Sequence, residues 1–222
     1  MTPPLLLLSG IRFAYPGCPP ILDQATLSLA PGQRLAVNGD NGAGKTTLLK
    51  LMVGLLKPQA GTIWAFGVAR RCEADFREVR ARAGLLFQDP DDQLFCPTVA
   101  EDVAFGPINL GKSPAEANAI ARRVLAGLGI DSLSDHAGHR LSTGQKKLAA
   151  LASVLAMEPE ILLLDEPSAG LDRTARTRLF ETLRVLPQAM ILVSHDAAFR
   201  DGLADSHVLL SEGRLIPDLP EG

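Results

Sequence analysis

Short apolar runs and stretches with helical spacing alternate along the chain. A run of four apolar residues, bounded by Glu160 and Asp165, is typical of a parallel strand buried on both faces. Turn-forming pairs, Pro16-Gly17 and Pro19-Pro20, separate the first two apolar runs. The expected strands are residues 11–15, 25–29, 35–37, 62–66, 84–88, 160–165 and 190–194, and residues 208–215 are expected to form a terminal hairpin.

Four segments have the spacing of a helix with one buried face. The clearest start is at Ser113, where Glu116 completes a capping box. Ile120, Val124 and Leu128 then recur on one face, which we expect to be the buried face of that helix. The expected helices are residues 45–56, 114–128, 144–157 and 174–186. Strands and helices in this order predict an α/β core with a parallel sheet, interrupted by a helical insertion from about residue 89 to 151.

Composition and charge narrow the class of protein. Of 222 residues, 46% are hydrophobic and 21% charged, which fits an ordinary globular domain. The formal net charge of -3 argues against a nucleic-acid binder that works by bulk positive charge. No apolar run approaches the roughly 20 residues of a membrane span, so we expect contact with a membrane only through a partner. Three widely spaced cysteines favour a reduced, cytoplasmic protein.

The segment from position 39 to position 47 matches the G-x-x-x-x-G-K-[ST] pattern of a phosphate-binding loop, and it lies between an expected strand and an expected helix. Its residues, all expected to bind the nucleotide, are Gly39, Asp40, Asn41, Gly42, Ala43, Gly44, Lys45, Thr46 and Thr47. Glycines allow backbone N–H groups to face an anion at a helix N-terminus. Lys45 would reach the β- and γ-phosphates, and the Thr46 hydroxyl would help to hold Mg²⁺. A glycine-rich turn with a chance lysine is the alternative interpretation.

Two acids follow the buried run at residues 161–164. Asp165 stands where an enzyme with a phosphate-binding loop places a second magnesium anchor. Glu166 comes next, and a carboxylate there would polarise an attacking water molecule. The alternative is an acidic strand end that is simply solvated.

A third segment, at residues 141–145, lies at the start of an expected helix. It reads Leu-Ser-Thr-Gly-Gln and resembles the L-S-G-G-Q signature of ABC transporter ATPases, from which it departs only at Thr143. The resemblance covers nearly the whole chain, with the segments in the right order. It implies that Ser142, Gly144 and Gln145 complete the ATP site of an opposing subunit, where a serine hydroxyl and helix N-terminal N–H groups suit a γ-phosphate. An ordinary N-cap at Ser142 is the alternative.

The same resemblance assigns roles to four further residues. Tyr15 matches the aromatic residue that stacks on adenine, and a tyrosine packed on the core is the alternative. Gln88 matches the glutamine that contacts Mg²⁺ and the attacking water. His195 ends an expected strand, where α/β proteins bind ligands, and matches the histidine that contacts the γ-phosphate. Asp172 belongs to a loop that crosses the dimer interface in the family.

The resemblance also implies the fold, the cofactors and the partners. It implies a P-loop NTPase (RecA-like) core with a mostly parallel sheet, an N-terminal antiparallel β-subdomain and an inserted α-helical subdomain. Residues 1–88 and 152–222 would form the nucleotide-binding core of one ABC ATPase domain, and residues 89–151 the helical subdomain. The expected cofactors are ATP and Mg²⁺, and the expected catalytic residues are Glu166, His195, Gln88 and Lys45. We expect a peripheral protein at the cytoplasmic face of the cell membrane, paired with a second ATPase subunit as a homodimer.

Residues 87–95 read Phe-Gln-Asp-Pro-Asp-Asp-Gln-Leu-Phe and resemble a segment of the ATPases of energy-coupling-factor transporters, which import vitamins, cobalt and nickel. In that group a membrane T component sends arginine-bearing helices into a groove on each ATPase. Asp89, Asp91 and Asp92 are suited to pair with arginines, with Leu94 and Phe95 as apolar contacts. A solvated acidic turn is the alternative.

The motifs leave several functions possible. A membrane substrate-capture subunit would select the substrate, for which we expect cobalt or nickel. Biotin-type vitamin uptake and another class of ABC transporter are the alternatives. A non-hydrolysing regulatory subunit is a further one, because Thr143 departs from the signature.

Overall fold

The structure is a computed structural model, and it describes residues 3–218. The strands are β1 Leu6–Phe13, β2 Leu22–Leu29, β3 Arg34–Asn38, β4 Ala60–Ala65, β5 Val68–Arg70, β6 Ala83–Leu86, β7 Ile161–Asp165, β8 Ala189–Val193, β9 Ser206–Ser211 and β10 Arg214–Pro217. The α-helices are α1 Lys45–Met52, α2 Glu73–Arg82, α3 Val99–Asn109, α4 Pro114–Gly127, α5 Thr143–Leu155, α6 Arg173–Arg184 and α7 Ala197–Asp201. Short 3-10 turns lie at η1 Pro90–Asp92, η2 Asp131–Leu133 and η3 Gly138–Arg140. None of the helices in residues 3–218 combines the length and the apolar character needed to cross a bilayer.

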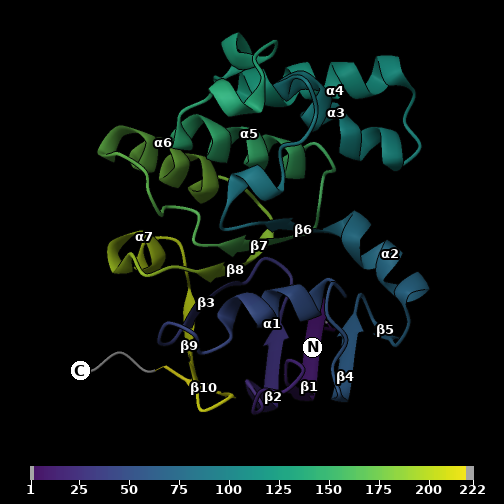
Figure 1. Ribbon diagram of the computed structural model, residues 1–222, viewed down its shortest axis with the longest axis vertical. Coiled ribbons are helices and arrows are strands. Elements are labelled where there is room, and N and C mark those ends of the chain that lie inside the picture. The colour runs from purple at the N-terminus through teal and green to yellow at the C-terminus, as the bar shows by residue number, and fades with distance from the viewer. Residues whose placement is uncertain (1–2, 219–222) are drawn as a thin grey trace.

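The strands build two sheets. The first sheet has the order β2-β1-β4-β5 and is antiparallel throughout. The second has the order β10-β9-β3-β8-β7-β6, in which β9, β3, β8, β7 and β6 pair in parallel and β10 adds an antiparallel edge. Helix α1 lies between the two sheets, and α5 and α6 cover the opposite face of the second sheet (Figure 1). The expected fold, a mostly parallel sheet with an antiparallel β-subdomain and added helices, is confirmed.

Successive side chains of β7 enter two different hydrophobic cores, one on each face of the second sheet. Because successive side chains of a strand point to opposite faces, Ile161 and Leu163 enter the core shared with α1 and the antiparallel sheet, and Leu162 and Leu164 enter the core beneath α3 to α6. Every residue of β7 is buried, as the continuous apolar run predicts. The strand is therefore clamped on both faces, which fixes the position of Asp165 at its end.

The expected hairpin and strands are present, with ends displaced by a few residues. Three helices, α2, α3 and α7, and the short strand β5 were not expected. The buried face of α4 is displaced by one position from the expected one, because Ala117, Ala121 and Leu125 are the most buried residues of the helix. Of the expected residues, Leu128 is buried, and Ile120 and Val124 are half-buried against the same core. The α4 helix packs mainly against α3. Small alanines at this contact allow the two helices to approach closely, and a count of large apolar residues misses such a face.

Gly54 holds a close contact beneath α2. Its φ is 71°, and a Cβ atom placed there would lie 2.2 Å from Cγ of the buried Phe76 ring. We expect Gly54→Ala to lower the free energy of unfolding by about 3 kcal/mol, since left-handed strain and steric overlap add. Gly67→Ala is the matched control, because Gly67 has a φ of 79° and no heavy atom within 4 Å of that position, and it should cost only about 1 kcal/mol. Urea unfolding of both variants measures the difference, and equal losses would contradict the packing argument.

Candidate functional site

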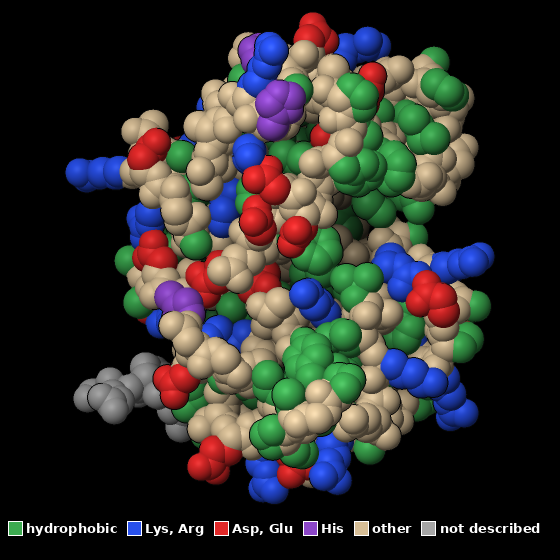
Figure 2. All heavy atoms as spheres, viewed as in Figure 1, with side chains coloured by type: hydrophobic (Ala, Val, Ile, Leu, Met, Phe, Trp, Pro, Cys, Tyr) green, Lys and Arg blue, Asp and Glu red, His purple; other side chains and the backbone are tan. Residues whose placement is uncertain are grey.

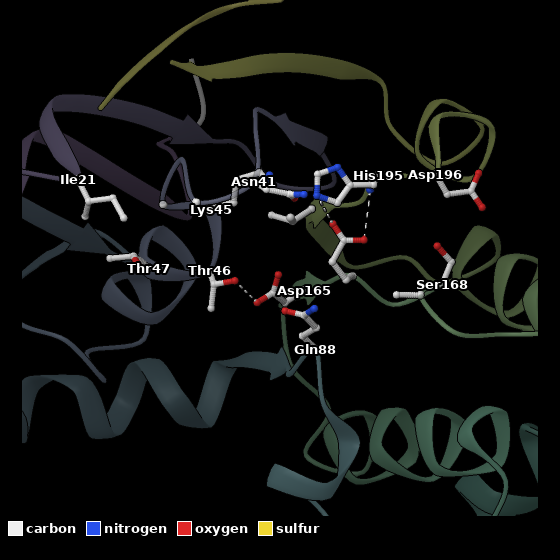
Figure 3. Close-up of a pocket in the computed structure, with 15 residues that line it drawn as sticks. Ile21, Asn41, Lys45, Thr46, Thr47, Gln88, Asp165, Ser168, His195 and Asp196 are labelled. Carbon is white, nitrogen blue, oxygen red and sulfur yellow. Dashed lines mark hydrogen bonds and ion pairs between the residues drawn. The ribbon is translucent and has the colours of Figure 1, made fainter. Parts of the chain in front are cut away.

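The carboxyl ends of β3, β7 and β8 open into one cavity of about 450 Å³. Parallel strands place their carboxyl ends at the same edge of a sheet, which is where α/β proteins form sites. Most of the residues expected to act on a nucleotide line this cavity or its mouth (Figure 3). They are Asn41, Gly42, Gly44, Lys45, Thr46, Thr47, Gln88, Asp165, Glu166 and His195.

Three glycines give the loop after β3 its shape. Gly39, Gly42 and Gly44 have φ values of 145°, 80° and 105°, which side-chain-bearing residues rarely adopt. At Gly39 a Cβ atom would also lie 2.6 Å from the carbonyl oxygen of Leu210, so the close approach of β9 requires glycine there as well. The loop leads directly into α1, whose unpaired N-terminal N–H groups attract an anion.

The Lys45 side chain folds back across the loop. Its Nζ donates hydrogen bonds to the carbonyl oxygens of Gly39 at 2.6 Å and Asp40 at 2.9 Å. The side chain is buried, although it reaches into the cavity. An ammonium group has three donors, so this arrangement leaves one N–H for an anion bound in the loop.

Side-chain oxygens from three parts of the chain meet at the end of β7. The Thr46 hydroxyl donates to Asp165 Oδ2 at 2.7 Å, and Asp165 Oδ1 is buried without a hydrogen-bond partner among the described residues. Burial raises the pKa of the Asp165 carboxyl, against the opposing effect of the Thr46 hydrogen bond. The Gln88 side chain points toward the same place (Figure 3). A hydroxyl, a carboxylate and a carboxamide oxygen suit Mg²⁺, and an unpartnered buried carboxylate oxygen is the group that a cation would satisfy.

Glu166 is held in an unusual backbone conformation beside His195. Its φ of 47° is left-handed, and its N–H donates to the Val193 carbonyl oxygen at 2.9 Å. The His195 N–H donates to Glu166 Oε2 at 3.2 Å, and Oε1 lies 3.5 Å from His195 Nε2. The Glu166 residue is 8% exposed, whereas the His195 ring is about half-exposed. A nearly buried carboxylate and an accessible imidazole therefore share one wall of the cavity.

Tyr15 lies near the rim rather than within the core. Its ring is partly exposed and packs edge-on against Phe13 with centroids 5.0 Å apart. Its hydroxyl forms a hydrogen bond with Thr47 Oγ1 at 3.1 Å. The stacking role of Tyr15 remains a prediction.

Eight expected nucleotide-binding residues do not line this cavity. Four of them belong to the phosphate-binding loop or contact it: Tyr15, Gly39, Asp40 and Ala43. The other four stand at the starts of α5 and α6. Ser142 and Gln145 form a capping box at the start of α5, in which Ser142 Oγ accepts from the Gln145 N–H. Gly144 is buried, and a Cβ atom there would lie 2.8 Å from Cβ of Ala175 in α6. Asp172 caps α6 by accepting from the Ala175 N–H at 2.8 Å. Within one chain these residues have structural roles, and their action on a second subunit's nucleotide stays a prediction.

Lys147 was not predicted from the sequence as part of the site. Its side chain is buried in the middle of α5, and its Nζ donates to the Glu166 carbonyl oxygen at 2.6 Å. Burial lowers the pKa of the Lys147 amine, and the nearby carboxylates of Glu166, Asp165 and Asp89 oppose that effect. The signal was present in the spacing, because Lys147 shares the buried stripe of α5 with Gly144, three residues earlier.

Comparisons with known proteins agree with one another. The ABC transporter family model matches residues 22–169. A Brucella suis protein whose name places it among ABC transporter ATP-binding proteins is 50% identical over 96% of this chain and 89% of its own length. The cobalt import ATP-binding protein CbiO of Rhodobacter capsulatus is 43% identical over 97% of this chain and 78% of its own. The structure of cbiO1 from Clostridium perfringens, described as part of the ABC transporter complex cbiONQ, superposes with a TM-score of 0.84 at 34% identity, covering 97% of this chain and 88% of that one.

A phosphate-binding loop, an acid-lined cavity at the strand ends and these matches together identify the protein's class. The chain belongs to the ABC transporter family, as an ATP-binding subunit that hydrolyses ATP.

Proposed function

We propose that this chain powers import by an energy-coupling-factor-type ABC transporter, with a transition metal, cobalt or nickel, as the transported substrate. The observation that carries the proposal is an apolar groove beside the acidic segment of residues 87–95. Relatives with matching names support it, because one is called a cobalt import protein and another is part of a cbiONQ complex. Uptake of a biotin-type vitamin, or service to another class of ABC transporter, is the alternative.

The groove has a volume of about 390 Å³ and lies between the core and α3. Phe95, which is 66% exposed, and Phe105 in α3 pack edge-on at its mouth, with ring centroids 4.9 Å apart. Figure 2 shows apolar side chains gathered around a hollow on this face. Leu55 is also exposed and lines the same groove. Exposed aromatic residues gathered at a groove are typical of a protein-binding surface.

The backbone around Phe95 is fixed rather than loose. The buried Asp102 carboxylate accepts the N–H groups of Phe95 at 3.0 Å and Cys96 at 2.9 Å. Gln93 donates from Nε2 to the Ala150 carbonyl oxygen at 3.0 Å, which ties the segment to α5. Leu94 packs against the core beneath α3 to α6. The apolar contact with a partner would therefore come from Phe95 and Phe105. The partner would therefore meet a preformed surface.

The segment of residues 87–95 also carries three acidic side chains next to this surface. Asp89, Asp91 and Asp92 are all exposed, and Asp91 pairs with Lys146 at 2.6 Å. Asp89 Oδ1 accepts from the Asp91 N–H at 2.9 Å, which leaves its other oxygen free for a cation. Carboxylates beside an apolar groove suit an amphipathic helix that carries arginines, the chemistry expected of the T component.

The proposed reaction is the attack of water on the γ-phosphorus of ATP to give ADP and phosphate. Lys45 and the N–H groups of the loop would offset the charge of the triphosphate. Glu166 would accept the proton of the attacking water, and His195 would orient that water against the γ-phosphate. Mg²⁺ held by Thr46, Asp165 and Gln88 would supply further positive charge at the phosphate oxygens.

A second copy of the chain would complete the site with Ser142, Gly144 and Gln145. These residues stand at the N-terminus of α5, where N–H groups suit a γ-phosphate. Asp172 would lie in the loop that crosses between the copies. Loss of the γ-phosphate would remove the contact, and Gln88 would pass the motion to residues 89–151, the proposed helical subdomain next to the core formed by residues 1–88 and 152–222.

Purification of the assembled complex tests the proposal. We expect the chain to be recovered with one T-type membrane protein and a substrate-capture subunit, at the cytoplasmic face of the membrane, and uptake of labelled cobalt or nickel to depend on it. Recovery with a paired permease and a periplasmic binding protein would contradict the importer class. Uptake of biotin in place of metal would contradict only the substrate.

The groove itself is tested by changing its exposed rings. We expect the double variant Phe95→Ser with Phe105→Ser to lose co-purification with the membrane subunits by at least about tenfold, because central aromatic contacts dominate binding. ATP binding by the purified variant should be unchanged. Val185→Ser is the control, since Val185 is 78% exposed at the end of α6 and lies outside the groove. Full recovery of the double variant with membrane subunits would exclude the groove as the docking site.

A further inference from the structure

Lys147 is a buried cation for which the proposed reaction has no use. It lies five residues after Ser142 in α5 and is 3% exposed. Its Nζ donates to the Glu166 carbonyl oxygen at 2.6 Å, across 19 residues of sequence. A buried ammonium group is costly unless it is paired and hydrogen-bonded, so a lysine in this position needs a reason.

The surroundings of Lys147 are acidic. It lines a cavity of about 550 Å³ together with Thr46, Gln88 and Asp165, the three residues proposed to hold Mg²⁺. The carboxylates of Glu166, Asp165 and Asp89 all lie close enough to act on its charge. The ammonium group, together with Lys50 in the same cavity, thus balances a cluster of acids, and it does so from the helix that carries the signature segment.

The backbone of Glu166 depends on the contacts that hold it. A left-handed φ is strained for glutamate and persists only where the surroundings impose it. Its N–H donates to the Val193 carbonyl oxygen, and its C=O accepts from Lys147 Nζ at 2.6 Å and from the Ala169 N–H at 3.2 Å. The Val193 bond comes from the neighbouring strand, and the Lys147 bond comes from a side chain on α5. Removal of Lys147 would leave the Glu166 carbonyl with only the longer bond from Ala169.

We propose that Lys147 is a positioning residue, which ties the signature helix α5 to the backbone of Glu166 and thereby aims the Glu166 carboxylate. This inference rests on the proposed catalytic role of Glu166. A displacement of α5 would reach the peptide group that carries the carboxylate through this hydrogen bond. The link gives the chain an internal connection between the segment that would contact a second copy and the carboxylate of its own site.

The first test separates turnover from binding. We expect Lys147→Met to lower kcat about 10–10²-fold, the effect of a misplacement of about 1 Å, with KM for ATP changed by no more than about twofold. Lys147→Arg keeps the charge and the donors and should restore most of the rate. Lys112→Met, at an exposed lysine after α3, is the control for loss of a lysine. A rise in KM equal to the fall in kcat would overturn the inference.

A double-mutant cycle gives the sharper test. In a Glu166→Gln background, measured by single-turnover phosphate release, Lys147→Met should change the residual rate by no more than about twofold, because its effect passes through the missing carboxylate. The same loss in both backgrounds would make Lys147 a structural residue and overturn the inference, with the role of Glu166 intact. An unimpaired Glu166→Gln protein would instead overturn the catalytic role of Glu166. If Lys147→Met does not fold, Lys147→Gln, which keeps a neutral N–H donor, takes its place in the cycle.

Discussion

Replacement of Glu166 by glutamine is expected to lower ATP turnover about 10²–10⁴-fold while ATP binding is kept. The amide has nearly the same shape as the carboxylate and can still accept the His195 N–H, which now meets Glu166 Oε2 at 3.2 Å. It cannot take a proton from water at neutral pH. Phosphate release measures the loss, and equilibrium binding of labelled ATP measures what is kept.

Glu212→Gln is the matched control for that change. Glu212 also has a left-handed backbone, with a φ of 48°, but it lies exposed in the turn between β9 and β10, and outside the cavity. Its variant should hydrolyse ATP at the rate of the unchanged protein. Normal turnover by Glu166→Gln would remove Glu166 from the mechanism.

The second large effect is expected at Lys45. Lys45→Met keeps most of the side-chain length but removes the positive charge and the donors that face the loop. Since a hydrogen bond to a charged group contributes about 1.5–3 kcal/mol, affinity for ATP should fall roughly 10- to 150-fold. Titration calorimetry with Mg·ATP measures the change.

Lys57→Met provides the comparison for Lys45→Met. Lys57 is exposed in the segment after α1 and lies outside the cavity. Its loss should leave the affinity for ATP unchanged. An affinity of Lys45→Met within about twofold of the unchanged protein would mean that Lys45 keeps its bonds to the loop when ATP binds.

Much of the site could be predicted because its residues stand at positions that the backbone pattern marks. The loop before α1 has glycines at fixed spacing, Asp165 ends the fully buried strand β7, and His195 comes shortly after the fully buried strand β8. The carboxyl ends of parallel strands meet at one edge, so sequence order alone brings these residues together. The bond between the His195 N–H and the Glu166 carboxylate was not predictable, since it depends on the left-handed turn at Glu166.

The missed elements have physical reasons of their own. Helix α2 is rich in charge and buries only Phe76 and Val79, too few apolar residues to set a period. Helix α3 contains Pro107 next to a glycine, a pair that usually ends a helix. Lys147 is missed for a different reason, because a lysine on a helix is normally solvated and the sequence does not name its acceptor. In all three cases the structure depends on tertiary contacts that the sequence pattern does not show.

The direct measurement of the central claim, that ATP is hydrolysed in a site completed by a second copy, is the molar mass of Glu166→Gln by light scattering with and without Mg·ATP. Bound but unhydrolysed ATP should hold two chains together, so we expect twice the mass of one chain with ATP and a single chain without nucleotide or with ADP. A variant that binds ATP and keeps the mass of one chain would contradict the claim.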